Sequence, residues 1–187
     1  MKPTDFEWLE PDGLGGFASG TSLGTRTRRY HALLLVSRKP PTDRRVLVNG
    51  MDVVVDVGGE RVALTSQTYK PTLETDEPIV RHEGRPVKAV FDDSLWPTWT
   101  FDLGHGRTIE HSIMVPRGFT FVVLSWRLFS PDPEPAAQLT VRPFLSGRDY
   151  HSLHHENPEF NFKPEIDAPT GRTLFRPYAG EPAVEAW

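Results

Sequence analysis

Cysteine is absent from this sequence of 187 residues, which excludes a disulfide framework and thiol chemistry. No apolar run approaches the roughly 18 residues that a membrane-spanning helix needs. The first residues also lack the apolar stretch of a signal peptide. The chain has no excess of positive charge, because its formal net charge is -4. Nucleic-acid-binding domains usually carry a basic patch. We therefore expect a cytoplasmic protein that binds neither nucleic acid nor a membrane.

Helical periodicity is missing as well, because no segment of about 11 residues or more places its apolar residues on one helical face. Instead, short apolar segments alternate with turns that contain many of the 15 glycines and 18 prolines. A spacing of about 8–12 residues between such segments is typical of sandwiches and barrels. We predict an all-β fold, an antiparallel two-sheet β-sandwich with few or no helices. The length suits a single domain over residues 1–187.

Two of the expected strands have distinctive patterns. Asn49-Gly50 predicts a hairpin turn between strands at 46–48 and 52–57, because Asn-Gly suits a type I′ turn. Residues 119–129 are apolar on both faces, so we expect a central strand that is covered on both sides. The other expected strands are 31–37, 61–65, 99–103, 107–115, 137–145, 172–176 and 184–187, with turns at 58–59 and 104–106 and a stiff connection at 131–135.

A dense run of glycines near the start is the most informative feature of the chain. Gly13, Gly15, Gly16, Gly20 and Gly24 indicate that the backbone turns or is approached closely there. A dinucleotide-binding loop also has clustered glycines, but it needs a preceding strand and a following helix. Here a strand follows and no helix is visible. We expect a loop that packs against a sheet edge or an interdomain surface.

Arginine, tyrosine and histidine occur together at two places that are far apart in the sequence. The first group is Arg28, Arg29, Tyr30 and His31, and the second is Arg148, Asp149, Tyr150 and His151. Arginine and aspartate offer hydrogen bonds of fixed geometry to sugar hydroxyls, and tyrosine offers an apolar face with a polar tip. These groups predict either a rim that faces a glucan or a neighbouring domain, or an Arg–Asp pair that ties two loops together. Since neighbours in a strand point to opposite faces, at most two residues of the first group can share one site.

The opening residues resemble a known family. They run Glu-Trp-Leu, then Asp-Gly-Leu-Gly-Gly-Phe-Ala-Ser-Gly-Thr, then Thr-Arg-Arg-Tyr-His-Ala-Leu-Leu-Leu. This run closely resembles the amino-terminal domain of the bacterial and archaeal glycogen debranching enzymes, the amylo-alpha-1,6-glucosidase family. The chain has Asp12, Phe17 and Ala32 where that family usually has Asn, Tyr and Gly. The Arg-Asp-Tyr-His sequence at 148–151 also resembles a loop of the family, and the resemblance covers essentially the whole chain.

The resemblance implies a supersandwich-type N-terminal β domain of a glycogen-debranching α-1,6-glucosidase. Such a domain would pack on a helical (α/α)6 catalytic barrel and shape the glucan site. The expected partners are therefore that barrel, which is absent here, and an α-glucan such as glycogen. The chain stops within an expected strand, which fits a piece of a longer enzyme. The candidate substrate-binding residues are Arg28, Arg29, Tyr30, His31, Arg148, Asp149, Tyr150 and His151.

Glycoside hydrolysis needs two carboxylates across the scissile bond, and the spacing of the acidic residues singles out no such pair. The available carboxylates include Glu7, Glu10, Asp12, Asp92, Asp93, Asp149 and Glu156. In the resembling family the catalytic acids lie in the helical barrel, and no residue here matches them. We expect no catalytic residue, no cofactor and no hydrolase activity in the isolated chain.

Four potential metal ligands lie close together near the second group: His151, His154, His155 and Glu156. The last three have the spacing of ligands on a helix, but Pro158 follows closely and no helical pattern surrounds them. We therefore expect an exposed loop and no metal site. Trp99 belongs to the alternating apolar face of its strand, which predicts a core position, whereas the position of Trp96 stays open.

Two other functions stay open. A stand-alone carbohydrate-binding module for α-glucans would bind glycogen or maltooligosaccharides by itself, and an Arg148→Ala/Tyr150→Ala variant would lose that affinity. A mutarotase-like enzyme would need a histidine and a glutamate that face one pocket. An accessory domain would instead bind glucan weakly on its own and expose an apolar patch where the barrel packs.

Overall fold

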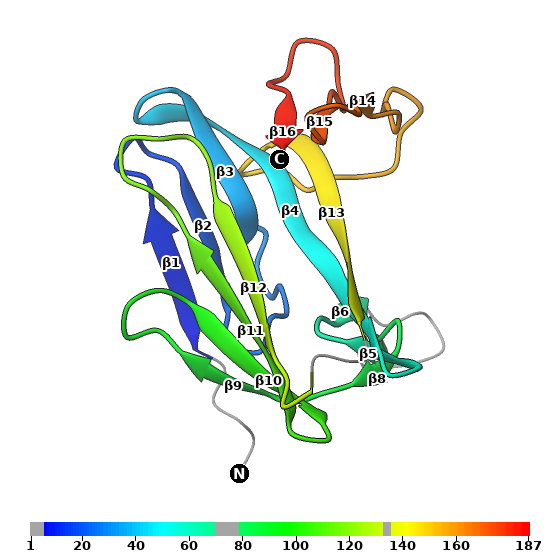
Figure 1. Cartoon of the computed structure of the whole chain (residues 1–187). Coiled ribbons are helices and arrows are strands. Elements are labelled where there is room, and N and C mark those ends of the chain that lie inside the picture. The colour runs from blue at the N-terminus through cyan, green and yellow to red at the C-terminus, as the bar shows by residue number, and fades with distance from the viewer. Residues whose placement is uncertain (1–5, 70–78, 133–135) are drawn as a thin grey trace.

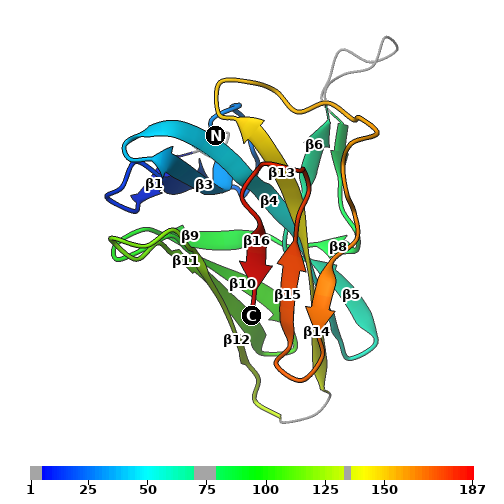
Figure 2. The same cartoon turned by 90° about the horizontal axis from the view of Figure 1, so that it is seen from above.

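The computed structural model of the chain describes residues 6–69, 79–132 and 136–187. Within these ranges all regular secondary structure is β, and the strands form four sheets (Figure 1). The two largest sheets pack against each other around the main hydrophobic core, as the view from above shows (Figure 2). The predicted all-β two-sheet sandwich is therefore confirmed. The described ranges contain no helix with the length and hydropathy of a membrane span.

The largest sheet has seven strands and is built around one long central strand. Its strands are β1 (Glu7–Pro11), β2 (Phe17–Thr21), β3 (Ala32–Lys39), β4 (Thr42–Val57), β5 (Glu60–Ala63), β8 (Arg85–Pro86) and β13 (Ala137–Asp149). They lie in the order β1-β2-β3-β4-β5-β8, and β13 pairs with the other edge of β4. All pairs are antiparallel except β5 with β8.

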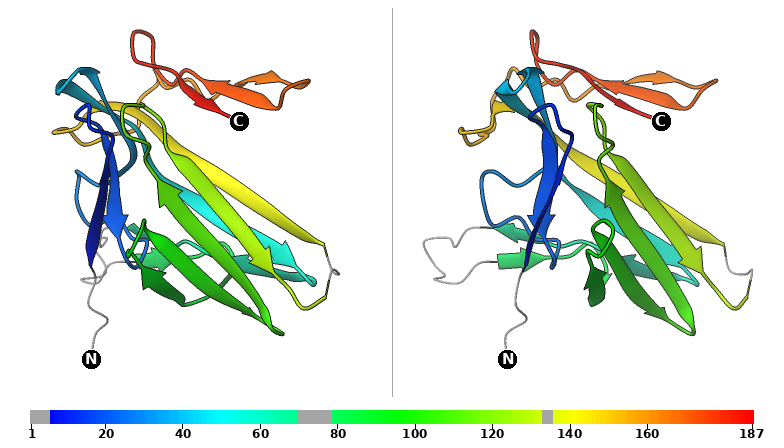
Figure 3. Two further views of the ribbon diagram at one scale, coloured as in Figure 1. Left: turned by 60° about the vertical axis from the view of Figure 1, so that its left-hand side comes forward. Right: turned by 90° about the vertical axis from the view of Figure 1, so that its left-hand side faces the viewer.

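A four-stranded antiparallel sheet, in the order β12-β11-β10-β9, forms the second layer. A three-stranded sheet, β14-β15-β16, lies across one end of the sandwich (Figure 3), and β6 and β7 form a separate hairpin. The bounds of these strands are β6 (Gln67–Tyr69), β7 (Ile79–Arg81), β9 (Ala89–Asp92), β10 (Thr98–Gly104), β11 (Arg107–Met114), β12 (Val123–Phe129), β14 (Glu165–Asp167), β15 (Arg172–Phe175) and β16 (Val184–Ala186).

Two tryptophans join the large sheets at the centre of the sandwich. Trp8 on β1 and Trp99 on β10 meet edge to face, with ring centroids 5.7 Å apart. Trp8 Nε1 donates to the carbonyl of Thr21 (3.2 Å), and Trp99 Nε1 donates to that of Ser22 (2.7 Å). Both buried indole donors are thus satisfied, as burial requires. The core position predicted for Trp99 is confirmed, whereas Trp96 is 36% exposed.

A buried histidine continues this aromatic stack across the four-stranded sheet. His111 on β11 lies between Trp99 and Trp126, with ring centroids 5.5 and 4.7 Å away and nearly parallel planes. Its Nδ1 is 3.0 Å from the carbonyl oxygen of Ser125, so Nδ1 carries the proton and donates it. Burial lowers the pKa of His111 to about 4, although the hydrogen bond to Ser125 opposes the shift. The imidazole is therefore neutral at neutral pH.

The predicted hairpin at Asn49-Gly50 is wrong, because β4 runs through both residues without turning. β13 pairs with β4 along nearly the whole length of β4, and Phe144 on β13 lies opposite Gly50. The side-chain oxygen of Asn49 accepts a hydrogen bond from Arg148 Nε (3.1 Å). A Cβ at Gly50 would lie 3.2 Å from Arg26 Cδ. The Asn-Gly pair thus provides room and a hydrogen-bond acceptor within a strand, and tertiary pairing overrides its turn preference.

The predicted central strand at 119–129 is also wrong. Only 123–129 forms a strand, and β12 is an edge strand whose one partner among the described strands is β11. Leu124 and Trp126 pack against the main core. Phe119, Phe121 and Phe129 are 56%, 47% and 46% exposed. The apolar pattern is real, but the described part of the chain covers only one side of this strand.

The other predicted strands are confirmed with shifted ends, as β3, β5, β10, β11, β13, β15 and β16. The turns at 58–59 and 104–106 are confirmed by positive φ angles at all five residues. Part of the predicted connection at 131–135 lies outside the described residues. Strands β1, β2, β6, β7, β8, β9 and β14 have two to five residues each, too few to show a clear alternation.

Gly13, Gly15 and Gly16 lie in the turn of the β1–β2 hairpin at the edge of the large sheet, in accord with the expected sheet-edge loop, whereas Gly20 lies in β2 and Gly24 follows it. Asp12 is buried, and its Oδ1 accepts hydrogen bonds from the backbone nitrogens of Leu14 (2.7 Å) and Gly16 (2.9 Å). A Cβ on Gly16 would lie 2.5 Å from the carbonyl oxygen of Leu35 and still closer to the Asp12 carboxylate. Only glycine fits at position 16. The hydrogen bonds from Leu14 and Gly16 to the Asp12 carboxylate stabilise the turn.

We expect Gly16→Ala to destabilise the protein by more than about 2 kcal/mol, because the added methyl group overlaps backbone that cannot move freely. Gly13→Ala is the matched control. Gly13 also has a positive φ of 78° but has no atom within 4 Å of an added Cβ, so its cost is about 1 kcal/mol. Urea unfolding of both variants measures the difference. Equal losses in the two variants would contradict the role given to Gly16.

We also expect His111 to make stability depend on pH. Its pKa is about 4 when folded, against an ordinary value of 6.5, so the unfolded chain binds more protons between these values. The stabilisation is complete above about pH 6.5 and is lost as the pH falls toward about 4, by about 3 kcal/mol in total.

Urea unfolding at about pH 7 and about pH 4 tests this expectation in the protein and in a His111→Phe variant. The variant keeps an aromatic ring between Trp99 and Trp126 but has no group to protonate. It should lose clearly less stability over this pH range. An identical loss in both proteins would show that other groups cause the pH dependence.

Candidate functional site

The two Arg/Tyr/His groups, which are about 120 residues apart, meet on the surface of the folded chain. Tyr30 contacts both Tyr150 and His151, with ring centroids 5.4 and 5.9 Å apart. The rings of Tyr150 and His151 lie 3.9 Å apart. We call these three side chains the Tyr/His platform. Tyr30 is 40% exposed and His151 is also exposed, so two rings of the platform face solvent.

Hydrogen bonds between the two groups hold the platform together. Arg29 Nη1 donates to the carbonyl of His151 (2.9 Å), and the Tyr30 hydroxyl lies 3.4 Å from His151 Nδ1. Arg29 also lies over the ring of Tyr30, 5.7 Å from its centroid. Tyr150 packs below on a small hydrophobic cluster that includes Leu35. The platform is therefore anchored on the sheet and presents aromatic faces beside an arginine.

Arg148 links the two groups from beneath. Its Nη2 donates to the carbonyl of Arg29 (2.6 Å), and its Nη1 donates to the carbonyls of Tyr150 (3.3 Å) and Ser152 (2.8 Å). Burial lowers the pKa of this guanidinium, and the charge of Arg26 adds to the effect. Because backbone carbonyls already take its donors, Arg148 shapes the loops and offers little to a ligand.

Asp149 is occupied in the same way. Its Oδ2 accepts from Arg45 Nη1 (2.8 Å), and its Oδ1 accepts from the backbone nitrogen of His151 (2.9 Å). The Arg–Asp pair that the alternative reading expected is formed by Arg45 and Asp149. Arg148 instead joins the loops through backbone carbonyls.

Arg28 and His31 point away from the platform toward Glu7 on β1. Arg28 Nε pairs with Glu7 Oε1, and His31 Nε2 lies 3.6 Å from the same oxygen. His31 is only 5% exposed and its Nδ1 accepts from the backbone nitrogen of Thr27 (3.2 Å). Two residues of the first group, Arg29 and Tyr30, thus belong to the platform, and the other two, Arg28 and His31, face Glu7. Strand alternation is not the reason for this division. Residues 28–30 form a turn before β3 begins, so strand alternation does not apply to them.

Arg44 belongs to the same surface and is missing from the predicted set. Its guanidinium lies 5.4 Å from the centroid of the Tyr150 ring, and its Nε donates to the carbonyl of Pro41 (3.2 Å). The only sequence signal is the Arg44-Arg45 pair near the start of β4. Arg29 thus lies against Tyr30 and Arg44 against Tyr150, so each of these two rings has a guanidinium beside it.

The histidine loop after β13 is held by hydrogen bonds of His154. His154 Nε2 lies 2.6 Å from the Tyr178 hydroxyl, and His154 Nδ1 lies 3.3 Å from Ser146 Oγ. Burial and the charges of Arg148 and His155 lower the pKa of His154. Its ring is therefore used in packing the loop against β13. Over the described ranges of the chain, no three His, Asp or Glu side chains are arranged to hold an ion.

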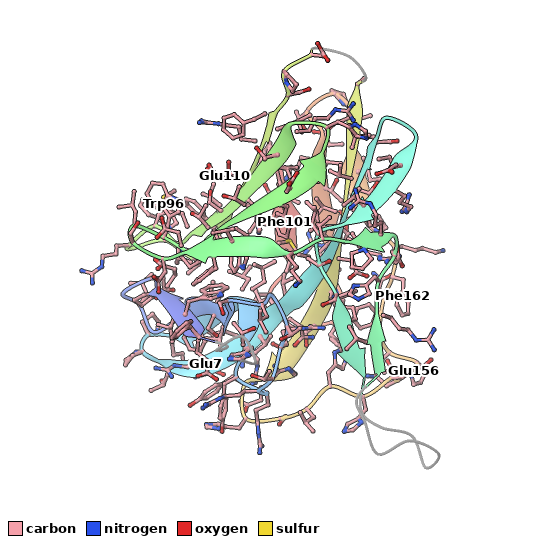
Figure 4. All side chains as sticks on the ribbon, turned by 90° about the horizontal axis from the view of Figure 1, so that it is seen from below. Glu7, Trp96, Phe101, Glu110, Glu156 and Phe162 are labelled. Atoms are coloured by element: carbon pink, nitrogen blue, oxygen red, sulfur yellow. The ribbon has the colours of Figure 1, made fainter. Side chains whose placement is uncertain are left out.

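Three of the carboxylates named from the sequence are already bound within the described part of the chain. Glu7 pairs with Arg28, Asp12 binds backbone nitrogens, and Asp149 pairs with Arg45. Glu7 and Glu156 lie on well-separated parts of the surface (Figure 4). Burial raises the pKa of Glu10. This shift comes from desolvation and not from a neighbouring carboxylate. The chemistry that the site offers is recognition, through aromatic faces and hydrogen-bond donors.

Comparison with known proteins gives one match. A family model described as "Glycogen debranching enzyme N terminal" matches residues 7–187 of the chain. No curated protein and no solved structure matches it significantly. The match spans both Arg/Tyr/His groups and the sheets that carry them.

We expect Arg148→Ala to lower the free energy of unfolding by more than about 2 kcal/mol, because several carbonyls lose a charged donor. Arg29→Ala is the matched control, since the side chain of Arg29 makes one hydrogen bond to the described residues, to the carbonyl of His151 at the surface, and should cost less than about 1 kcal/mol. Thermal or urea unfolding measures both variants. If Arg148→Ala were as stable as Arg29→Ala, Arg148 would be free to serve a ligand instead.

Proposed function

The chain belongs to the glycogen debranching enzyme N-terminal family, and from this premise we propose that it is the N-terminal β domain of a glycogen-debranching α-1,6-glucosidase. In that role it packs on a helical (α/α)6 catalytic barrel and forms one wall of the glucan site. The observation that carries the proposal is the Tyr/His platform, to which two distant parts of the chain contribute. The catalytic carboxylates then belong to the barrel, and the β domain contributes recognition.

The chemistry of the platform supports a glucan as ligand. A pyranose ring has an apolar face that stacks on aromatic rings, and its hydroxyls accept hydrogen bonds from arginine and histidine. Tyr30 and His151 supply the exposed rings, while Arg29 lies beside Tyr30 and Arg44 lies beside Tyr150. Of the eight predicted substrate-binding residues, we propose contact with sugar for Arg29, Tyr30, Tyr150 and His151.

The apolar surface around β12 supports packing on a second domain. Phe119 and Phe121 contact each other and are both exposed, and Phe129 is exposed at the end of the strand. On β13, the next strand along the chain, Leu139 and Val141 are each 36% exposed. Exposed apolar side chains that gather on one surface mark interaction sites. We propose that the catalytic barrel covers this surface.

We expect the isolated chain to release no glucose from a branched limit dextrin. A separately produced helical domain of a glycogen debranching enzyme should gain activity on that dextrin when this chain is added. With a Tyr30→Ala/His151→Ala chain, the gain should fall by about tenfold, which corresponds to about 1.4 kcal/mol of lost recognition. Glucose release measures all three results.

Phe162→Ala is the matched control for this experiment. Phe162 is an aromatic side chain that is 80% exposed and lies outside the platform, so its removal should leave the gain unchanged. Hydrolysis by the isolated chain would refute the division of roles between the two domains. Equal loss of activity in the Phe162→Ala and platform variants would refute the part given to the platform.

Glycogen affinity electrophoresis separates this proposal from a stand-alone carbohydrate-binding module. An accessory domain is retarded weakly by glycogen, whereas a module is retarded strongly and loses this retardation when the platform is removed. Tyr30→Ala/His151→Ala is the informative variant, because Arg148→Ala also changes the loops that carry the platform.

A further inference from the structure

A cavity of about 400 Å³ lies between the two large sheets. Strands of both sheets line it, together with the loop that follows β2 and the segment that precedes β9. None of the three platform residues belongs to its lining. Leu23, Pro86 and Lys88 do belong to it and are exposed, so the cavity opens to solvent there. Its volume lies within the range of small-molecule sites.

The inner wall of the cavity is apolar. The large buried hydrophobic side chains that line it are Trp8, Leu33, Leu64, Trp99, Phe101 and Ile113. Phe101, labelled in Figure 4, lies on the face of β10 that packs toward the large sheet. The indole nitrogens of both tryptophans already donate to backbone carbonyls. The aromatic part of this wall therefore offers carbon surface to a ligand.

The buried polar side chains of the inner wall also have partners within the chain. Ser19 Oγ and Thr21 Oγ1 donate to backbone carbonyls at 3.3 and 2.8 Å, and Ser22 Oγ accepts from a backbone nitrogen at 3.1 Å. His111 Nδ1 donates to a backbone carbonyl, and its Nε2 is inaccessible. The inner wall therefore favours an apolar group, which gains contact there without burying an unpaired polar atom.

The mouth of the cavity is polar and positively charged. Its partly or fully exposed polar residues include Arg26, Asn49, Ser66, Gln67, His82 and Lys88. Arg26 and Lys88 carry positive charge, and in the described part of the chain no aspartate or glutamate belongs to the lining. A cleft lined by charge of one sign attracts a ligand of the opposite sign.

The acidic residues next to the lining do not cancel this charge. Asp52 and Glu83 each follow a lining residue in the sequence, and both carboxylates pair with the same guanidinium, that of Arg142. Arg142 is not part of the lining. The negative charges nearest in sequence are therefore directed to a cation outside the cavity.

The two cations of the mouth differ in what they already bind. Arg26 Nη2 donates to Gln67 Oε1 (2.8 Å), and its guanidinium lies 5.1 Å from the centroid of the Phe144 ring. Lys88 forms no hydrogen bond or ion pair with any other described residue. Its ammonium group is therefore available to an anion at the mouth.

We propose that this cavity binds an amphipathic monocarboxylate, whose apolar tail lies between the sheets and whose carboxylate stays at the mouth beside Lys88. The apolar inner wall accepts the tail, and one available ammonium group matches one negative charge. A medium-chain fatty acid is the simplest compound of this class. The site is distinct from the platform and does not depend on the proposed role in glucan recognition.

The test compares octanoate with octan-1-ol, which have chains of the same length but differ in the charge of the head group. Titration calorimetry measures affinity, and two-dimensional NMR locates the ligand through shifts at Leu64 and Ile113. We expect octanoate to bind about threefold more tightly than octan-1-ol, since an ion pair at an exposed site is weak. This preference should shrink as the salt concentration rises, because salt screens exposed charges.

Lys88→Gln removes the charge at the mouth and should abolish the preference for octanoate. Lys39→Gln is the matched control, because Lys39 is also exposed but does not line the cavity, so it should leave the preference unchanged. Tyr30→Ala should leave both affinities unchanged, which separates this site from the platform.

Ala89→Trp tests whether the tail enters the cavity. Ala89 lines the cavity and pairs with Phe101 across the sheet, so both side chains lie on the same face. A tryptophan there narrows the opening and should weaken both compounds by about tenfold. Lys88 and Ala89 are exposed, so both variants should fold.

The proposal is overturned if octanoate does not shift the NMR signals of cavity residues, or if Ala89→Trp binds it as tightly as the unaltered protein. It is also overturned if octan-1-ol binds as tightly as octanoate, or if the preference for octanoate persists in Lys88→Gln. Loss of the glucan role with retained octanoate binding would refute only the proposed function.

Discussion

The pairing of β4 with β13 is the constraint on which the rest of the fold depends. β4 is hydrogen-bonded to β13 on one edge and to β3 and β5 on the other, so it lies at the centre of the large sheet. This pairing brings Arg148 to Asn49 and Asp149 to Arg45. The loop after β13 is thereby placed beside the turn that precedes β3. Both Arg/Tyr/His groups owe their contact to this register.

The eight residues of these groups divide by what their polar atoms already bind. Arg148 and Asp149 bind backbone and a neighbouring arginine, and Arg28 and His31 bind Glu7. Arg29, Tyr30, Tyr150 and His151 remain, and of these Arg29, Tyr30 and His151 are exposed at the surface. Each motif thus contains residues whose side chains stabilise the loop and residues whose side chains face solvent. The hydrogen bonds in the structure distinguish these two sets, whereas the residue types alone do not.

Much of the fold could be predicted from the sequence because its long strands alternate clearly and its turns contain glycines. The errors arise where distant contacts decide. Asn49-Gly50 has the local signature of a turn, and only its pairing with Phe144 keeps it extended. The 119–129 segment is apolar on both faces, and no local rule says that one face stays uncovered. At the site, the meeting of Tyr30 with His151 depends on a register that spans most of the chain, so composition could suggest the residues but not their division of roles.

The β4–β13 register also has a consequence for how the chain folds. Arg45 and Asp149 are separated by 104 positions in the sequence, and pairing of such remote segments requires closure of a long loop. Folds dominated by remote pairings form slowly. On the ribosome, the edge of β4 that β13 covers stays unpaired until synthesis has passed Asp149. During that interval the apolar centre of β4 is an unpaired strand edge, which is the kind of edge that pairs with other chains and leads to aggregation.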